Sequence, residues 1–232
     1  MRRLLRLLLL KPILRAAAKF SSKPDRQRIF KALTDLQESI QQEPGKKGLV
    51  IPFTLDAGKF IIFSDQHKGR RNGADDFTTA EPNYLAALEY YYQQDFYFIN
   101  LGDSEELWEN NLWQVKKKNK ANFEAERKFL DHNRYIKVFG NHDLFWDNDP
   151  LAGWQLKSIY GERVKVYEGV VLKPLVVSPE SLAADEAKGL TTHESPLTIF
   201  LTHGHQGDAS SDGNWFSKFF VAKIWAPLQA FL

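Results

Sequence analysis

The sequence predicts an α/β fold in which short strands alternate with helices. Apolar runs rich in β-branched and aromatic residues recur along the chain, and segments between them carry apolar residues at helical spacing. This alternation is typical of βαβ units and of layered sheets. With 232 residues, of which 43% are hydrophobic, the chain is long enough to bury one sizeable core.

The expected elements follow one another in a regular order. Residues 22–25 resemble a helix start, and apolar positions at helical spacing continue to Gln42, which predicts an amphipathic helix. The segment from Glu43 to Gly48 is rich in turn residues and places a domain boundary near Gly45. Beyond this boundary we expect strands at 49–55, 58–64, 95–101, 135–139, 164–167 and 170–177, and helices at 82–93 and 119–131.

Four short polar clusters each follow an apolar run. In chain order they are Asp65-Gln66-His67, Gly102-Asp103-Ser104-Glu105-Glu106, Gly140-Asn141-His142-Asp143 and His203-Gly204-His205. Strands of α/β sheets deliver functional side chains at their carboxyl ends, so we expect these clusters to converge. The chain contains no cysteine, which excludes disulfides, a thiolate nucleophile and Cys-based zinc sites. Any metal ion would therefore be held by carboxylate, amide and imidazole groups.

Hydrolysis of a phosphate ester is one reaction whose chemical requirements such a cluster could meet. That reaction needs a nucleophilic oxygen, neutralisation of charge on the phosphoryl oxygens and a proton for the leaving group. Two metal ions about 3.5–4 Å apart can meet the first two needs. Asp65 and His67 are two residues apart, and strand alternation would direct both side chains toward a first metal ion.

The four clusters together resemble the motifs of the calcineurin-like metallophosphoesterase superfamily, over about residues 58–208. The resemblance implies a four-layer α/β/β/α sandwich at residues 45–232. The charge and helical spacing of residues 1–44 predict a basic amphipathic helical extension before it. The resemblance also implies metal-dependent hydrolysis of a phosphomonoester or phosphodiester by a dinuclear metal centre. Manganese, iron or zinc are the expected ions, and magnesium is a further candidate. Residues 144–196 are less regular, and we interpret them as an insertion that shapes substrate access.

The resemblance implies a set of metal ligands. Asp103 would bridge the two metal ions, because a carboxylate has two oxygens. Asp65 and His67 would hold the first metal ion, and Asn141 and His203 the second.

The resemblance also implies a proton donor. His142 would stabilise phosphoryl charge and protonate the leaving oxygen without being a metal ligand. Glu106 would orient this histidine, and a carboxylate so placed favours the protonated ring. Asp143 could do the same or could brace the loop.

The end of the motif set departs from the family pattern. Similar proteins carry a final Gly-His-x-His that gives one ligand to each metal ion, whereas here Gly204-His205 is followed by Gln206-Gly207. We interpret His203-Gly204-His205 as the penultimate motif. A truncated gene product, a fragment, or a variant in which His205 contacts metal or substrate all remain open. The alternative function is a catalytically impaired binding or scaffold protein of the same fold at a membrane surface.

Basic residues suggest two further contacts. Arg70 and Arg71 follow the first cluster and could bind a substrate phosphate, although a solvated loop is an equal alternative. The chain lacks a basic body with interleaved aromatic residues, so nucleic-acid binding is not favoured. Oligomeric state does not follow from the sequence.

The first residues form a basic tail. Residues 1–31 carry ten Lys or Arg against one acid, and Lys11, Arg15 and Lys19 share one helical face. This pattern is typical of a helix on an anionic membrane surface, so we expect a cytoplasmic protein that contacts a membrane through residues 1–20. A packed helix, a weak secretory signal and a transit peptide are alternatives. The apolar stretch at 215–228 could cover the site, contact lipid or pack on further chain.

Overall fold

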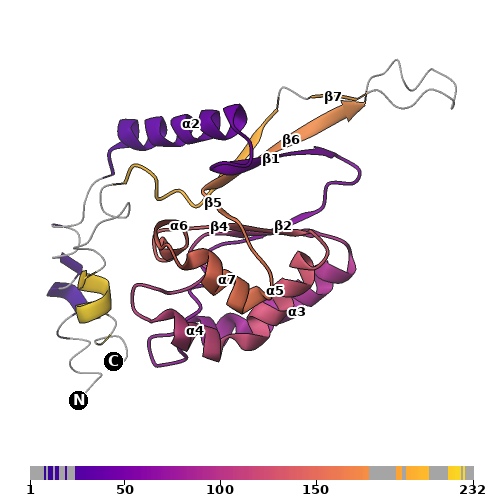
Figure 1. Cartoon of the computed structure of the whole chain (residues 1–232). Coiled ribbons are helices and arrows are strands. Elements are labelled where there is room, and N and C mark those ends of the chain that lie inside the picture. The colour runs from indigo at the N-terminus through magenta and orange to yellow at the C-terminus, as the bar shows by residue number, and fades with distance from the viewer. Residues whose placement is uncertain are drawn as a thin grey trace, which may run out of the picture.

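The computed structural model describes residues 24–177, 192–194, 197–208, 219–225 and 227, together with scattered positions between 8 and 19. Within these residues the chain forms helices and two four-stranded sheets, which confirms the predicted α/β class (Figure 1).

One sheet is wholly parallel and is built from the predicted βαβ units. Its strands, in spatial order, are β2 (Phe60–Phe63), β3 (Tyr97–Leu101), β4 (Tyr135–Val138) and β5 (Val166–Tyr167). All four residues of β4 are buried, as expected for a strand of a parallel sheet that is covered on both faces. The covering helices on one face are α3 (Phe77–Gln93), α5 (Lys120–Leu130) and α7 (Ala152–Tyr160).

The other sheet is mixed and is centred on β6 (Gly169–Val177). Strand β1 (Gly48–Thr54) pairs with β6 in parallel. Two further strands, β7 (Thr192–Glu194) and β8 (Ile199–Thr202), pair with β6 in antiparallel orientation.

Helix α2 (Arg26–Gln42) covers the outer face of the mixed sheet. Its buried residues Leu36 and Ile40 pack against Val171 of β6. The side chain of Asp25 caps the helix by accepting hydrogen bonds from the backbone N–H groups of Gln27 and Arg28, both at 3.1 Å. This helix therefore shares a core with the sheet, although the sequence placed a domain boundary after it.

The two sheets face each other across a common apolar layer. Ile99 and Ile136 of the parallel sheet pack against Val170 and Leu172 of the mixed sheet. Phe98, the neighbour of Ile99, points to the opposite face and joins the core under the helices. Figure 1 shows α2 above the mixed sheet and α3, α5 and α7 below the parallel sheet.

Several elements were not predicted. Helices α4 (Leu112–Lys118) and α6 (Phe145–Asn148) are short, and α7 lies in the segment expected to be an insertion. The described part of that segment also supplies β5 and β6, so residues up to 177 contribute to both sheets.

The termini are described only in part. No helix among the described residues is long and apolar enough to cross a membrane. The described positions between 8 and 19 are helical and exposed, among them Lys11 and Arg15. The membrane contact expected for residues 1–20 stays a prediction.

A network of buried charges lies beneath the carboxyl ends of the parallel strands. Lys68, Glu105, Glu126 and Lys137 are all 0% exposed. Glu105 Oε2 lies 2.8 Å from Lys137 Nζ, and Glu105 Oε1 lies 3.3 Å from Lys68 Nζ, which also contacts Glu126. Although burial raises the pKa of Glu105, the two lysines outweigh that effect and lower it to about 2. The network therefore pairs two lysines with two glutamates.

We expect Lys137→Met to lower the free energy of unfolding by about 3–5 kcal/mol, because it leaves Lys68 as the one lysine beside the two buried carboxylates of Glu105 and Glu126. The matched control is Lys128→Met, which removes an exposed pair with Glu89 and should cost less than about 1 kcal/mol. Both values come from chemical denaturation followed by circular dichroism. Equal losses in the two variants would contradict the view that Lys137 neutralises Glu105.

Candidate metal centre

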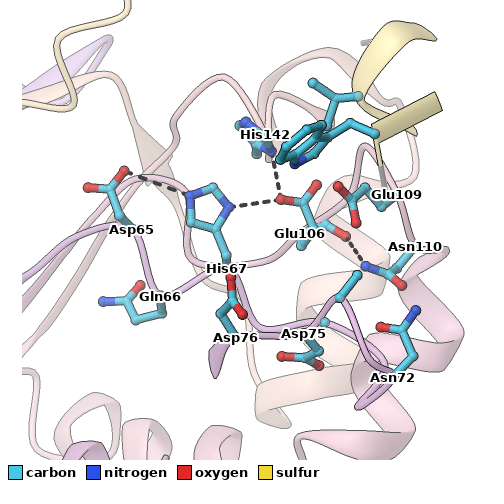
Figure 2. Close-up of a pocket in the computed structure, with 14 residues that line it drawn as sticks. Asp65, Gln66, His67, Asn72, Asp75, Asp76, Glu106, Glu109, Asn110 and His142 are labelled. Atoms are coloured by element: carbon cyan, nitrogen blue, oxygen red, sulfur yellow. Dashed lines mark hydrogen bonds and ion pairs between the residues drawn. The ribbon is translucent and has the colours of Figure 1, made fainter. Parts of the chain in front are cut away.

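The structure brings most of the predicted site residues together at one edge of the parallel sheet. The loops that follow β2, β3 and β4 supply three of the polar clusters, and the residues after β8 supply the fourth. The side chains that converge are Asp65, His67, Asp103, Glu106, His142 and His203. Figure 2 shows four of them, Asp65, His67, Glu106 and His142, among the residues that line a pocket.

Left-handed backbone turns orient three of these residues. The φ angles are 58° at Asp65, 48° at His67 and 49° at Asp103, in a region that residues other than glycine rarely adopt. Strand β2 ends at Phe63, so these turns, and not strand alternation as the sequence suggested, direct Asp65 and His67. Such conformations cost about 1–3 kcal/mol each and cluster at functional sites.

The neighbouring loop holds these turns in place. The backbone N–H of Asp65 donates to the carbonyl oxygen of Gly102 at 3.1 Å, and that of His67 donates to the carbonyl of Asp103 at 2.9 Å. Hydrogen bonding between the two chain segments thus continues beyond the ends of β2 and β3.

Four donor atoms converge on one small volume. His203 Nε2 lies 3.4 Å from Asp65 Oδ1 and 3.3 Å from Asp103 Oδ2. His67 Nε2 lies 3.8 Å and 3.7 Å from the same two oxygens. Donor atoms around a tetrahedral ion with bonds of about 2.0–2.1 Å are separated by about 3.4 Å. The distances of His203 to the two carboxylates match that separation, and His67 Nε2 lies slightly farther from the same two oxygens.

Glu106 joins two histidines. Its Oε2 atom lies 2.8 Å from His67 Nδ1 and 2.7 Å from His142 Nδ1. The contact with His142 is the one that the sequence predicted, whereas the contact with His67 was not expected. Although burial raises the pKa of Glu106, the two histidines lower it to about 2. A carboxylate bonded to the second nitrogen of a histidine is a common support for a metal ligand.

Two groups of residues could each hold a metal ion. One is Asp65, Asp103 and His203, and the other is His67, Glu106 and His142, with donor atoms in each group within 4.8 Å of one another. This grouping differs from the expected one, which placed His67 with Asp65 and assigned His142 no metal. The donor types suit divalent cations.

The electrostatics of the cluster also favour a cation. Burial lowers the pKa of His67, but Glu106 and the two aspartates outweigh it and raise the pKa. The pKa of His203 is raised in the same way, against burial, by Asp103 and Asp65. Although burial raises the pKa of Asp103, His203 and His142 hold it below its usual value. The carboxylates of Asp65, Asp103 and Glu106 thus lie close together and would attract a cation.

His142 is held on three sides. Its backbone N–H donates to Asp103 Oδ1 at 2.8 Å, and its ring stacks on Trp108 with a centroid distance of 4.0 Å. The indole N–H of Trp108 in turn donates to the carbonyl oxygen of Asn141 at 2.7 Å. Sequence reasoning missed Trp108, and the available signal was an aromatic residue two positions after Glu106.

Asn141 and Asp143 flank His142 with different contacts. The side chain of Asn141 makes no hydrogen bond to another described residue, which leaves its amide oxygen free for a ligand. Asp143 is fully buried and accepts hydrogen bonds from the backbone N–H groups of Gly140 at 2.6 Å and Ser104 at 2.9 Å. Of the two roles considered for Asp143, the structure shows that it braces the loops.

The remaining candidates lie beside or outside the cluster. His205 is buried behind His203, with 3.3 Å between their Nδ1 atoms. Arg71 is engaged by Glu81 and by the carbonyl oxygen of Lys118 at 2.7 Å. Arg70 is exposed. The roles suggested for these three residues stay predictions.

A cavity of about 360 Å³ opens beside His67 and His142 (Figure 2). The loop after β2, the loop after β3 and the segment at 219–225 line it. Val221 and Trp225 of that last segment reach the cavity, so part of the apolar stretch predicted near the carboxyl terminus borders the site.

Two glycines of the motifs are required by close packing. A Cβ atom on Gly140 would overlap Asp103 Oδ1 and lie 2.6 Å from the backbone nitrogen of Asp103. A Cβ atom on Gly102, which has a φ of +82°, would lie 2.7 Å from three carbon atoms of His203. Both glycines therefore allow a candidate ligand to approach a neighbouring loop.

We expect Gly140→Ala to weaken divalent metal binding by at least about tenfold, because the new methyl group displaces Asp103. The matched control is Gly153→Ala, at a helical position with open space around its Cβ, which should bind metal as the parent does. Isothermal titration with Mn²⁺ and with Zn²⁺ measures both. Unchanged affinity in a folded Gly140→Ala variant would remove Asp103 from the ligand set.

Comparisons of the chain with protein-family models, with curated proteins and with solved structures found no match. The interpretation of the site therefore rests on its motifs and geometry.

Proposed function

We propose that this protein is a calcineurin-like metallophosphoesterase that hydrolyses a phosphomonoester or phosphodiester with two divalent metal ions. The observation that carries this proposal is the convergence of Asp65, Asp103 and His203 beside a histidine pair that Glu106 holds. The fold supports it, because a helix, two facing sheets and a helical layer succeed one another as in the sandwich that the family resemblance implies.

The residues present fit the proposed cofactor. Metal ligands must be deprotonated carboxylates or neutral imidazoles, and the lowered pKa of Asp103 keeps it ionised at neutral pH. Asp65, His67, Asp103 and His203 would hold metal, with Asn141 as a further oxygen donor. When bound, two such ions supply an activated water and neutralise charge on the phosphoryl oxygens. Manganese, iron, zinc and magnesium all remain candidates.

His142 is the proposed acid for the leaving group. Its Nδ1 atom is bonded to Glu106, so Nε2 is the nitrogen left to contact a substrate. Stacking on Trp108 and the backbone hydrogen bond to Asp103 fix the orientation of the ring. A histidine in this arrangement can donate its Nε2 proton to the departing oxygen while Glu106 stabilises the charged ring.

We expect His142→Ala to lower the rate of alkyl phosphate hydrolysis by about 10²–10⁴-fold, because general acid catalysis contributes that much. The loss should be smaller with p-nitrophenyl phosphate, whose leaving group needs little protonation. Steady-state kinetics with added Mn²⁺ on both substrates measures this difference. An equal loss on the two esters would rule out His142 as the proton donor.

We expect Asp103→Asn to lose both turnover and bound metal, because it removes charge from the centre of the ligand set. Elemental analysis of the dialysed protein gives metal content, and p-nitrophenyl phosphate and bis-p-nitrophenyl phosphate report activity. A parent protein that holds two metal ions without hydrolysing either ester would favour the binding or scaffold alternative. A parent that holds no metal would reject the proposed function.

A further inference from the structure

The cavity beside His142 has an acidic wall that the proposed reaction does not use. Asp75 and Glu109 line it together with the amide side chains of Asn72 and Asn110 (Figure 2). Trp225 also lines the cavity. Among the described residues that line this cavity there is no lysine or arginine, although Arg70 lies close enough to act on the charge of Glu109.

Several polar groups in this wall lack partners. In the described part of the chain, the carboxylate of Glu109 makes no hydrogen bond or ion pair. Asp75 Oδ2 accepts from the backbone N–H of Arg71 at 2.6 Å, but Asp75 Oδ1 is buried without a partner. Gln66 is only 8% exposed, and neither atom of its amide has a hydrogen-bond partner among the described residues.

Such groups indicate a ligand. Buried polar atoms in folded proteins are nearly always hydrogen-bonded, so unpaired ones around an open cavity favour an occupant that pairs with them. Carboxylates accept hydrogen bonds and attract positive charge, and an aromatic face also binds ammonium groups. A second phosphate or a carboxylate in the same place would be repelled by Glu109 and Asp75.

We propose that this cavity binds the leaving group of the ester, and that the leaving group is a small alcohol that carries an ammonium group. The substrates would then be phosphate esters of amino alcohols. The proposal rests on the proposed hydrolysis and adds a substrate class to it. In the reaction the P–O bond to the amino alcohol breaks, water supplies the new oxygen on phosphorus, and His142 supplies the proton to the departing oxygen.

The position of the cavity agrees with this role. His67, Glu106 and His142 form part of its lining, so a group held there lies next to the proposed acid. A cavity of about 360 Å³ is large enough for a short amino alcohol. Glu109 lies on the loop that also carries Glu106 and Trp108, so ammonium recognition and positioning of His142 would come from one segment.

The test measures how fast the full chain hydrolyses three matched phosphate esters in the presence of Mn²⁺. They are 2-aminoethyl phosphate, n-propyl phosphate, in which a methyl group replaces the ammonium group, and phosphoglycolate, which carries a carboxylate. Each is assayed as the monoester and as its methyl diester. We expect kcat/KM to be at least about tenfold higher for the aminoethyl ester than for the propyl ester, and lowest for phosphoglycolate.

Two variants locate the preference. Glu109→Gln should bring the aminoethyl to propyl ratio of kcat/KM close to one. The matched control is Glu124→Gln, which removes the same charge from an exposed position on α5 and should keep the parent ratio. If Glu109→Gln does not fold, competitive inhibition of the parent by ethanolamine but not by 1-propanol provides the same test.

The outcomes separate the two proposals. Turnover of p-nitrophenyl phosphate without any preference among the three esters, or with preference for phosphoglycolate, overturns the ammonium proposal and leaves the proposed function standing. Preference for the propyl ester would show an apolar subsite and would also overturn it. Absence of turnover on every ester by metal-loaded protein rejects the proposed function itself.

Discussion

The buried ion network of Lys68, Glu105, Lys137 and Glu126 is the constraint on which the site depends. Lys68 belongs to the loop after β2, Glu105 to the loop after β3, Lys137 to β4 and Glu126 to α5. Charged groups that are 0% exposed persist only with partners, so these four elements must meet in one arrangement. Tyrosine hydroxyls complete the network, since those of Tyr84 and Tyr160 donate to Glu126 at 2.8 Å and 2.6 Å. The network thereby fixes the position of the loops at the carboxyl ends of the strands.

The adjacent residues Glu105 and Glu106 have different partners, the first in the core and the second in the candidate site. Glu105 is directed inward, where Trp146 donates to it at 2.7 Å in addition to the two lysines. Glu106 is directed to the other side, where it bonds His67 and His142. Because Glu105 is fixed by its partners, the adjacent backbone of Glu106 has little freedom to move. The orientation of both histidines therefore follows from the charges buried one residue away.

The convergence of polar clusters at strand ends was predictable, because apolar runs and the residues after them are visible in the sequence. The contact of Glu106 with His142 could be anticipated from the family resemblance, which implies that this carboxylate orients the histidine. The left-handed turns at Asp65, His67 and Asp103 could not be anticipated in this way. The sign of φ at these residues depends on hydrogen bonds between loops that are distant in sequence. Pairing of β1 with β6 likewise joins segments more than a hundred residues apart, beyond the reach of local periodicity.

The loop after β2 shows how composition can misrepresent the charge that a site presents. Its sequence Lys68-Gly69-Arg70-Arg71 suggests binding of an anion. In the structure Lys68 forms ion pairs with two buried glutamates, and Arg71 forms one with Glu81. Neither residue lines the cavity. The same loop returns through Asp75, whose carboxylate lines the cavity instead. Two of the three cations of this segment anchor it, and Arg70 is exposed, so the cavity wall that the segment supplies is acidic. The charge that a substrate would meet at this wall depends on which side chains line the cavity after the loop is anchored, and here those are carboxylates and amides.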